Sequence, residues 1–98
     1  MTLVGSGGVV ITSLDRSNRF KKDWKKLPGL QALALEKLRD LMKSPMPNGL
    51  SFEKLKGYRN PAIYTIHVTG NYKISLEIIG GMAILRRFAS HDEIDRSP

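Results

Sequence analysis

The sequence contains no cysteine, which excludes disulfide bonds and thiolate metal sites. It also lacks any hydrophobic run close to the roughly 18 residues that a membrane span requires. Its first ten residues, Met1–Val10, have neither the basic start nor the long apolar stretch of a secretory signal. We therefore expect a reduced, cytoplasmic protein with no membrane partner.

Acidic residues are scarce as well. Sixteen lysines and arginines face nine aspartates and glutamates, which leaves a formal charge of +7 on 98 residues. Such a field attracts polyanions and speeds their encounter with the protein. The imbalance favours nucleic acid or an acidic protein as the partner, although a basic composition also suits a solubilising surface.

The length fits one domain, and 41% hydrophobic residues suffice for one small core. We expect a flexible leader at Met1–Gly8 and a single domain over residues 9–98. There is no internal repeat and no low-complexity segment.

The first half of the domain predicts a helical hairpin after a short strand. The strand is expected at Val9–Ser13, and the first helix at Leu14–Leu27 with Ser13 and Asp15 as possible N-caps. A second helix is expected at about Leu30–Lys43, ended by the turn residues that follow. The apolar positions with helical spacing are Phe20, Trp24 and Leu27 in the first helix and Leu30, Ala34, Leu38, Leu41 and Met42 in the second.

The second half changes to a period of two, which predicts strands. They are expected at Ala62–Val68, Tyr72–Ile79 and Met82–Ala89, joined by turns at residues 69–71 and 80–81. Three strands linked by hairpins form an antiparallel meander. Since only the helical hairpin can cover its apolar face, the pattern predicts an α+β fold with helices on one face of the sheet.

Alternation then leaves polar side chains on the other, open face. Thr65, His67 and Lys73 belong to it, and Arg87 is expected there while its neighbour Arg86 points to the opposite face. His91 follows the last strand. Cations stabilise phosphate and histidine can move a proton near neutral pH, so the face is a candidate phosphate-binding surface.

Each of these residues also has a simpler interpretation. His67 could be an ordinary surface or hydrogen-bonded histidine, and Lys73 an ordinary solvated charge. Arg86 or Arg87 could pair with Glu77 or Asp92 and do nothing else. The two histidines do not have zinc-site spacing and no glycine-rich phosphate loop precedes a helix, so we expect no metal and no cofactor.

Several short motifs together resemble the RelE/ParE toxin superfamily over roughly Val9–Asp95. They follow the helical hairpin in the order E-K-L-K-G-Y-R (Glu53–Arg59), Y-T-I-H-V-T-G-N-Y-K-I (Tyr64–Ile74) and I-L-R-R-F-A-S-H-D-E-I (Ile84–Ile94). The resemblance implies a helical hairpin on a curved antiparallel sheet. It implies a type II toxin that is a ribosome-associated mRNA endonuclease, or a gyrase inhibitor of the ParE type without nuclease activity.

The resemblance also suggests roles for individual residues. It implies that a ribose 2′-hydroxyl attacks the adjacent phosphate, with His91 moving a proton, Lys73 and Arg87 stabilising charge, and His67 as a second titrating group. The residues expected to bind RNA are Lys54, Lys56, Arg59 and Arg86.

Three positions depart from the pattern of the superfamily. Thr65 and His67 stand where many members have arginines, and Asp95 replaces a terminal tyrosine. A third possibility is therefore a catalytically degenerate toxin that acts in an antitoxin–repressor complex. In each case the expected partner is an acidic antitoxin, and for the nuclease also mRNA and the ribosome.

Overall fold

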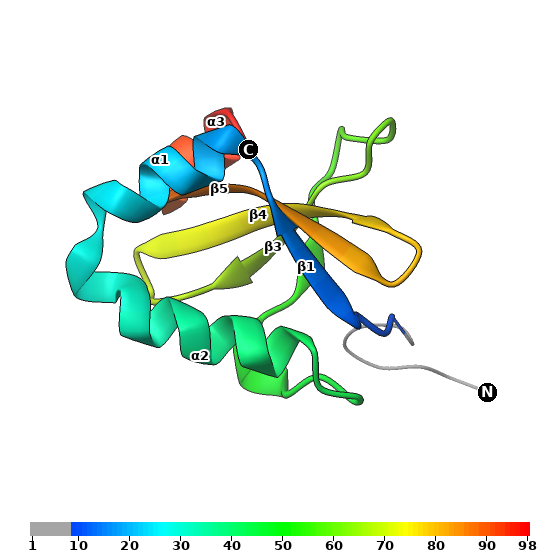
Figure 1. The fold of residues 1–98 in the computed structure, drawn as a ribbon. Coiled ribbons are helices and arrows are strands. Elements are labelled where there is room, and N and C mark those ends of the chain that lie inside the picture. The colour runs from blue at the N-terminus through cyan, green and yellow to red at the C-terminus, as the bar shows by residue number, and fades with distance from the viewer. Residues whose placement is uncertain (1–8) are drawn as a thin grey trace.

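A five-stranded sheet forms the centre of the protein (Figure 1), with strands in the order β1-β5-β4-β3-β2. The computed structural model describes residues 9–98, and the expected leader lies outside them. No helix within residues 9–98 is long and apolar enough to cross a membrane. The elements are β1 (Ser13–Arg16), α1 (Asn18–Lys26), η1 (Pro28–Leu30), α2 (Gln31–Leu41), η2 (Asn48–Leu50), β2 (Glu53–Lys54), β3 (Tyr64–His67), β4 (Tyr72–Ile79), β5 (Met82–Ser90) and α3 (His91–Arg96).

The predicted α+β class and the antiparallel β3-β4-β5 meander are confirmed, but the sheet is mixed. β1 pairs in parallel with β5, Ser13 opposite Met82 and Arg16 opposite Leu85, and begins four residues later than expected. The entry to β1 passes close to the β4–β5 turn, where the Thr12 N–H donates to the Gly81 carbonyl at 2.7 Å. A Cβ on Gly81 would lie 2.8 Å from Thr12 Oγ1, so a larger residue at this crossing would force the Thr12 side chain to move.

The helical hairpin is confirmed, with a different start. α1 begins at Asn18 because Ser17, not Ser13 or Asp15, is its N-cap; the Ser17 Oγ accepts from the Phe20 N–H at 3.1 Å. The expected caps were wrong because both belong to β1. All the predicted apolar positions of the two helices except the exposed Met42 pack in or against the core: Phe20, Trp24, Leu27, Leu30, Ala34, Leu38 and Leu41.

β5 contains a bulge that changes which side chains face the core. Ser75 pairs with Arg87 and Leu76 with Leu85, so Arg86 is an extra residue on β5. Both Leu85 and Phe88 are consequently buried in the core. The expectation that Arg86 and Arg87 point to opposite faces is wrong, because the bulge interrupts strict alternation. Both guanidinium groups reach the residues after α3: Arg86 Nη2 donates to the Pro98 carbonyl and Arg87 Nη1 to the Ser97 carbonyl.

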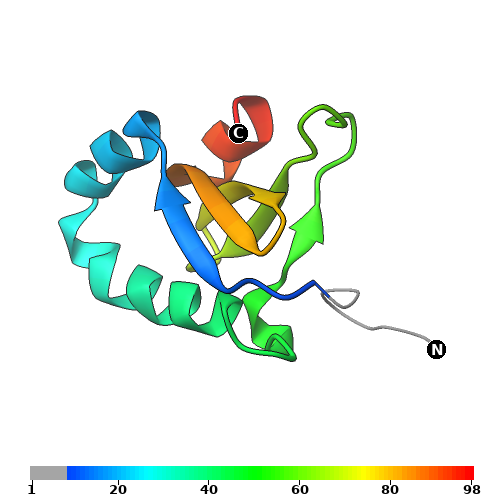
Figure 2. The ribbon, with the colours of Figure 1, turned by 45° about the vertical axis from the view of Figure 1, so that its right-hand side comes forward.

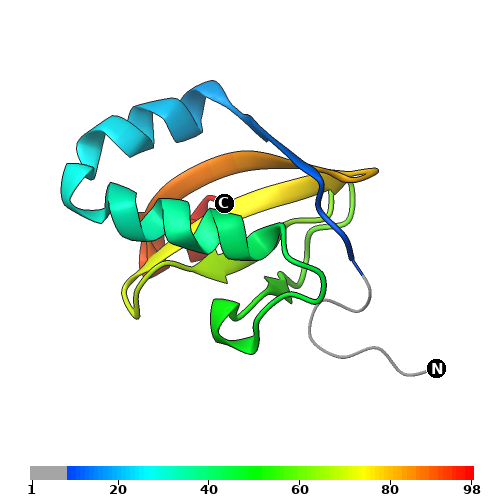
Figure 3. The same cartoon turned by 60° about the horizontal axis from the view of Figure 1, so that its bottom comes forward.

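The second face of the sheet is not open, which corrects another prediction. α3 packs on this face against β4 and β5 (Figure 2), and its Ile94 is fully buried. Thr65, Lys73 and Ser75, which alternation places there, are buried as well. The helical hairpin lies on the other side (Figure 3). The sheet is therefore covered on both faces.

We expect Ile94→Ala to lower the free energy of unfolding by about 2–5 kcal/mol, because it removes buried methyl groups between α3 and the sheet. Urea unfolding of the two proteins measures this. The matched control is Ile79→Ala, at a side chain that is 57% exposed, which should stay within about 0.5 kcal/mol of the parent. Equal stability of the two variants would show that α3 does not contribute to the core.

Candidate functional site

His67 and His91 meet at one end of the sheet. His67 is the last residue of β3 and His91 the first of α3. Their ring centroids are 6.4 Å apart and the rings stand nearly edge to face, at 76°. The His91 N–H donates to the Asn71 carbonyl at 2.7 Å, which ties the start of α3 to the β3–β4 turn. His67 and His91 are thus neighbours in space, although 24 positions separate them in the sequence.

A carboxylate that was not predicted as a site residue joins this pair. Asp95 lies one turn beyond His91 on α3, and its Oδ2 is 3.1 Å from His91 Nδ1. Its other oxygen, Oδ1, is 3.4 Å from the Lys73 ammonium. Asp92 is also close to His91 Nδ1, at 3.7 Å, but is 93% exposed. Asp95 therefore bridges the two predicted site residues His91 and Lys73.

Lys73 is on the predicted face, opposite His67 in the register of β3 and β4, but only 3% of it is exposed. Its ammonium faces the carboxylates of Asp95 at 3.4 Å and Glu53 at 3.8 Å. A buried ammonium requires such partners, because desolvation penalises an isolated charge heavily. Asp95 thus connects Lys73 to the pair formed by His67 and His91. The charge of Lys73 is already balanced by two carboxylates.

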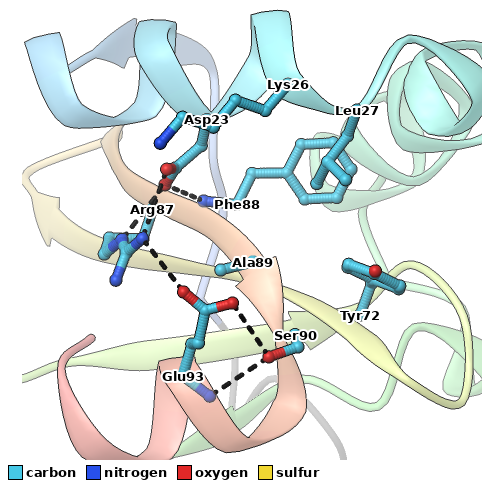
Figure 4. Close-up of a pocket in the computed structure, with 9 residues that line it drawn as sticks. All are labelled: Asp23, Lys26, Leu27, Tyr72, Arg87, Phe88, Ala89, Ser90 and Glu93. Atoms are coloured by element: carbon cyan, nitrogen blue, oxygen red, sulfur yellow. Dashed lines mark hydrogen bonds and ion pairs between the residues drawn. The ribbon is translucent and has the colours of Figure 1, made fainter.

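Arg87 is held at the junction of α1 and β5 (Figure 4), in a pocket that also includes Glu93 and Ser90. Its Nε and Nη2 donate to the two oxygens of Asp23 at 3.1 and 3.2 Å, and Glu93 lies 3.8 Å away. Asp23 also accepts the Phe88 N–H at 3.0 Å. The hydrogen bond to Asp23 raises the pKa of Arg87 above its ordinary value.

The remaining predicted cations lie elsewhere. Arg86 pairs with Glu77 at 2.6 Å. Lys54 is exposed on the edge strand β2, while Lys56 and Arg59 are exposed in the loop that follows it. Figure 2 shows this loop and α3 rising from the same side of the sheet. Their assignment to RNA, like that of the catalytic residues, stays a prediction.

Sequence reasoning missed three acidic residues that hold the predicted cations: Asp23, Glu53 and Asp95. For Asp95 a local signal existed. Ser90 and Glu93 have the S-x-x-E spacing of a capping box: the Ser90 Oγ accepts from the Glu93 N–H at 3.3 Å, and the Ser90 hydroxyl donates to Glu93 Oε1 at 3.2 Å. That motif predicts a helix from His91, and i, i+4 spacing on it would have paired His91 with Asp95.

We expect Asp23→Ala to destabilise the protein by about 3–5 kcal/mol, because it leaves the largely buried Arg87 guanidinium and the Phe88 N–H without their acceptor. Thermal or urea unfolding tests this. Asp40→Ala is the control, since Asp40 pairs with a Lys43 side chain that is 62% exposed and such surface pairs contribute only about 0–1 kcal/mol. A change of similar size in both variants would contradict a structural role for Asp23.

Comparison with known proteins adds the family. The sequence matches no protein-family model and no curated protein. Solved structures do match. A chain of the DinJ–YafQ toxin–antitoxin complex of E. coli superposes with a TM-score of 0.70 at 14% identity, over 83% of this chain and 93% of that one. A metal-bound toxin from Helicobacter pylori gives 0.68 at 21% identity, over 86% and 99%. At these identities the likeness concerns the fold alone.

A third solved structure is similar to this protein in sequence as well as in fold. A chain of the RelB–RelE antitoxin–toxin complex from Methanococcus jannaschii is 31% identical to this protein, with a TM-score of 0.66 over 86% of this chain and 99% of that one. This match covers nearly the whole relative, and the short sequence motifs agree with it. The chain therefore belongs to the RelE-like toxin superfamily.

Proposed function

We propose that the protein is the toxin of a type II toxin–antitoxin system and that it arrests translation by cleaving mRNA on the ribosome. The observation that carries the proposal is the pair of imidazoles, His67 and His91, at one end of the sheet of a strongly basic protein. Two titratable rings close together are what proton transfer at a phosphodiester needs: one group to accept a proton and another to donate one.

The proposed reaction is an internal transfer. One imidazole accepts the proton of the ribose 2′-hydroxyl while that oxygen bonds to the adjacent phosphorus. The bond from phosphorus to the 5′-oxygen breaks, and the other imidazole supplies the proton to the leaving oxygen. The products are a 2′,3′-cyclic phosphate and a 5′-hydroxyl. The atoms balance without a further reactant, and the two imidazoles end with exchanged protonation states.

The cations divide into two groups in this proposal. Lys73, Arg86 and Arg87 already face carboxylates, so they contribute less to phosphate binding than their charge suggests. Lys73 also reaches His91 through Asp95. The exposed Lys56 and Arg59 lie in the loop on the same side of the sheet as α3 and would bind the RNA backbone. Lys54 precedes them on β2.

The net charge and the similar solved structures both support an acidic antitoxin as the partner. A protein with a net charge of +7 presents a field complementary to an acidic partner, which favours rapid and specific association. The similar structures from E. coli and M. jannaschii are toxin–antitoxin complexes. We propose the same arrangement for this chain.

One observation favours a second candidate function. Because Lys73 and Arg87 are neutralised by carboxylates, fewer free cations remain beside the two histidines than a phosphate-cleaving site could use. This arrangement would suit a toxin without nuclease activity, either a gyrase inhibitor or a degenerate toxin in a repressor complex. Pulse labelling after induction separates the candidates: loss of protein synthesis supports the nuclease, and loss of DNA supercoiling with normal translation supports gyrase inhibition.

We expect His91→Ala and His67→Ala each to slow mRNA cleavage by about 10²–10⁴-fold, the range for removal of a general acid or base. The assay is primer extension on mRNA in a translation extract with purified toxin. His91 is 46% exposed, so its variant should keep the parent melting temperature. Asn71→Ala, a neighbouring exposed side chain, serves as the control and should cleave normally. Undiminished cleavage by both histidine variants would refute the proposed mechanism.

We expect RNA binding to weaken steeply with salt through the β2–β3 loop. Each phosphate contact contributes a slope of about −0.7 in log K against log salt on single strands, so Lys56→Ala/Arg59→Ala should flatten the slope by about 1.4. Fluorescence anisotropy with a short RNA measures it. The matched control, Arg39→Ala/Lys43→Ala, removes two exposed cations at and after the end of α2 and should leave the slope unchanged. Equal slopes in the two variants would place the RNA elsewhere.

A further inference from the structure

Asp95 takes no part in the proposed proton transfers, although it contacts both His91 and Lys73. We propose that Asp95 is a positioning residue: it fixes the tautomer and orientation of His91 so that Nε2 is the nitrogen that exchanges protons with RNA. This inference rests on the proposed nuclease function and assigns a residue and an atom within it.

The first argument concerns the proton on His91. Asp95 Oδ2 is 3.1 Å from His91 Nδ1, within hydrogen-bonding distance. An ionised carboxylate can only accept a hydrogen bond and repels a lone pair, so it favours the tautomer in which the neighbouring Nδ1 carries the hydrogen. In the neutral ring the lone pair is then on Nε2. The same nitrogen is the one left to donate when the ring is charged, whichever half of the reaction His91 performs.

The second argument concerns what holds Asp95 itself. Its side chain is 42% exposed and sits on a helix of only six residues, so the pairing with His91 alone would leave both groups loosely placed. Its other oxygen, however, faces the ammonium of the buried Lys73 at 3.4 Å. Lys73 is fixed in β4 and has Glu53 of β2 as a second partner at 3.8 Å. Asp95 therefore connects His91 to the rigid sheet.

The third argument comes from the neighbouring acid. Asp92 also approaches His91 Nδ1, at 3.7 Å, but its side chain is 93% exposed and no second ion pair holds it within residues 9–98. Asp92 and Asp95 carry the same charge on the same helix and differ in anchoring. Since positioning requires the anchor, we expect only Asp95 to matter.

The test compares Asp95→Asn with Asp92→Asn in purified, folded protein. The Asn amide can turn its NH₂ toward Nδ1, which places the ring hydrogen on Nε2. We expect Asp95→Asn to lower the single-turnover rate of mRNA cleavage by about 10–100-fold, the usual loss when an orienting partner is removed, with RNA affinity unchanged. Asp92→Asn should cleave within about threefold of the parent, as expected at an exposed position. Asp95→Glu, which keeps the carboxylate, should recover part of the rate.

Two further readouts separate positioning from a merely structural role. Nitrogen-15 NMR of the histidine rings should show hydrogen on Nδ1 of neutral His91 in the parent and in Asp92→Asn, and a shift toward Nε2 in Asp95→Asn. In a His91→Ala background, Asp95→Asn should cause no further loss of rate, because a residue that acts through His91 has nothing left to position. A structural residue would add its own loss to that of His91→Ala.

The outcomes distinguish this inference from the proposed function. If His91→Ala is inactive while Asp95→Asn cleaves like the parent or keeps hydrogen on Nδ1, Asp95 is not a positioning residue and the nuclease proposal stands. If His91→Ala cleaves normally, the nuclease proposal fails first. Should Asp95→Asn not fold, because Lys73 loses a partner, Lys73→Met/Asp95→Asn removes both charges of that pair and is tested in the same way. Parent-like cleavage by that double variant would overturn the inference as well.

Discussion

The bulge in β5 is the constraint on which the rest of the structure depends. A single extra residue, Arg86, allows Leu85 before it and Phe88 after it to enter the same core. In a regular strand the two would face opposite sides, since their separation is odd. The shift places Arg87 opposite Ser75 on the face that α3 covers, and it sends the chain into α3 in the register that pairs Tyr72 with Ser90. The position of His91 beside His67 follows from that register.

The parts of the fold that the sequence predicts are those with an unbroken period. β4 was predicted with its observed ends because Tyr72, Ile74, Leu76 and Ile78 alternate without interruption. The helical hairpin was predicted because apolar residues recur every three or four positions. The parallel pairing of β1 with β5 was not, because it joins segments about 70 residues apart and depends on contacts that no local pattern encodes. The bulge was missed because the sequence of β5 contains no local signal that marks Arg86 as an extra residue.

For the candidate site, the sequence indicated that the two histidines and Lys73 lie together, but it did not indicate which acids lie beside them. His67, Lys73 and His91 are indeed neighbours, as alternation and the end of the last strand indicated. What sequence reasoning could not supply was the state of Lys73 and Arg87, because their partners Glu53, Asp95 and Asp23 come from other elements. A cation counted as free in the sequence is free in the structure only if no carboxylate reaches it. On the face that α3 covers, the fold places at least one carboxylate beside each of Lys73, Arg86 and Arg87.

The order of strands in the sheet has a consequence for how the protein is made. β5 lies between β1 and β4, although it is the last of the five strands in sequence order within residues 9–98. β1 pairs within residues 9–98 with β5 alone, so the first strand to be synthesised waits for the last before it has a neighbour. Contacts of such long sequence separation form slowly, and they form only after the segment that completes them is available. His91 follows directly on β5 and reaches its place beside His67 through the same pairing. Within residues 9–98, neither the five-stranded sheet nor the histidine pair is therefore complete until β5 and His91 have been synthesised.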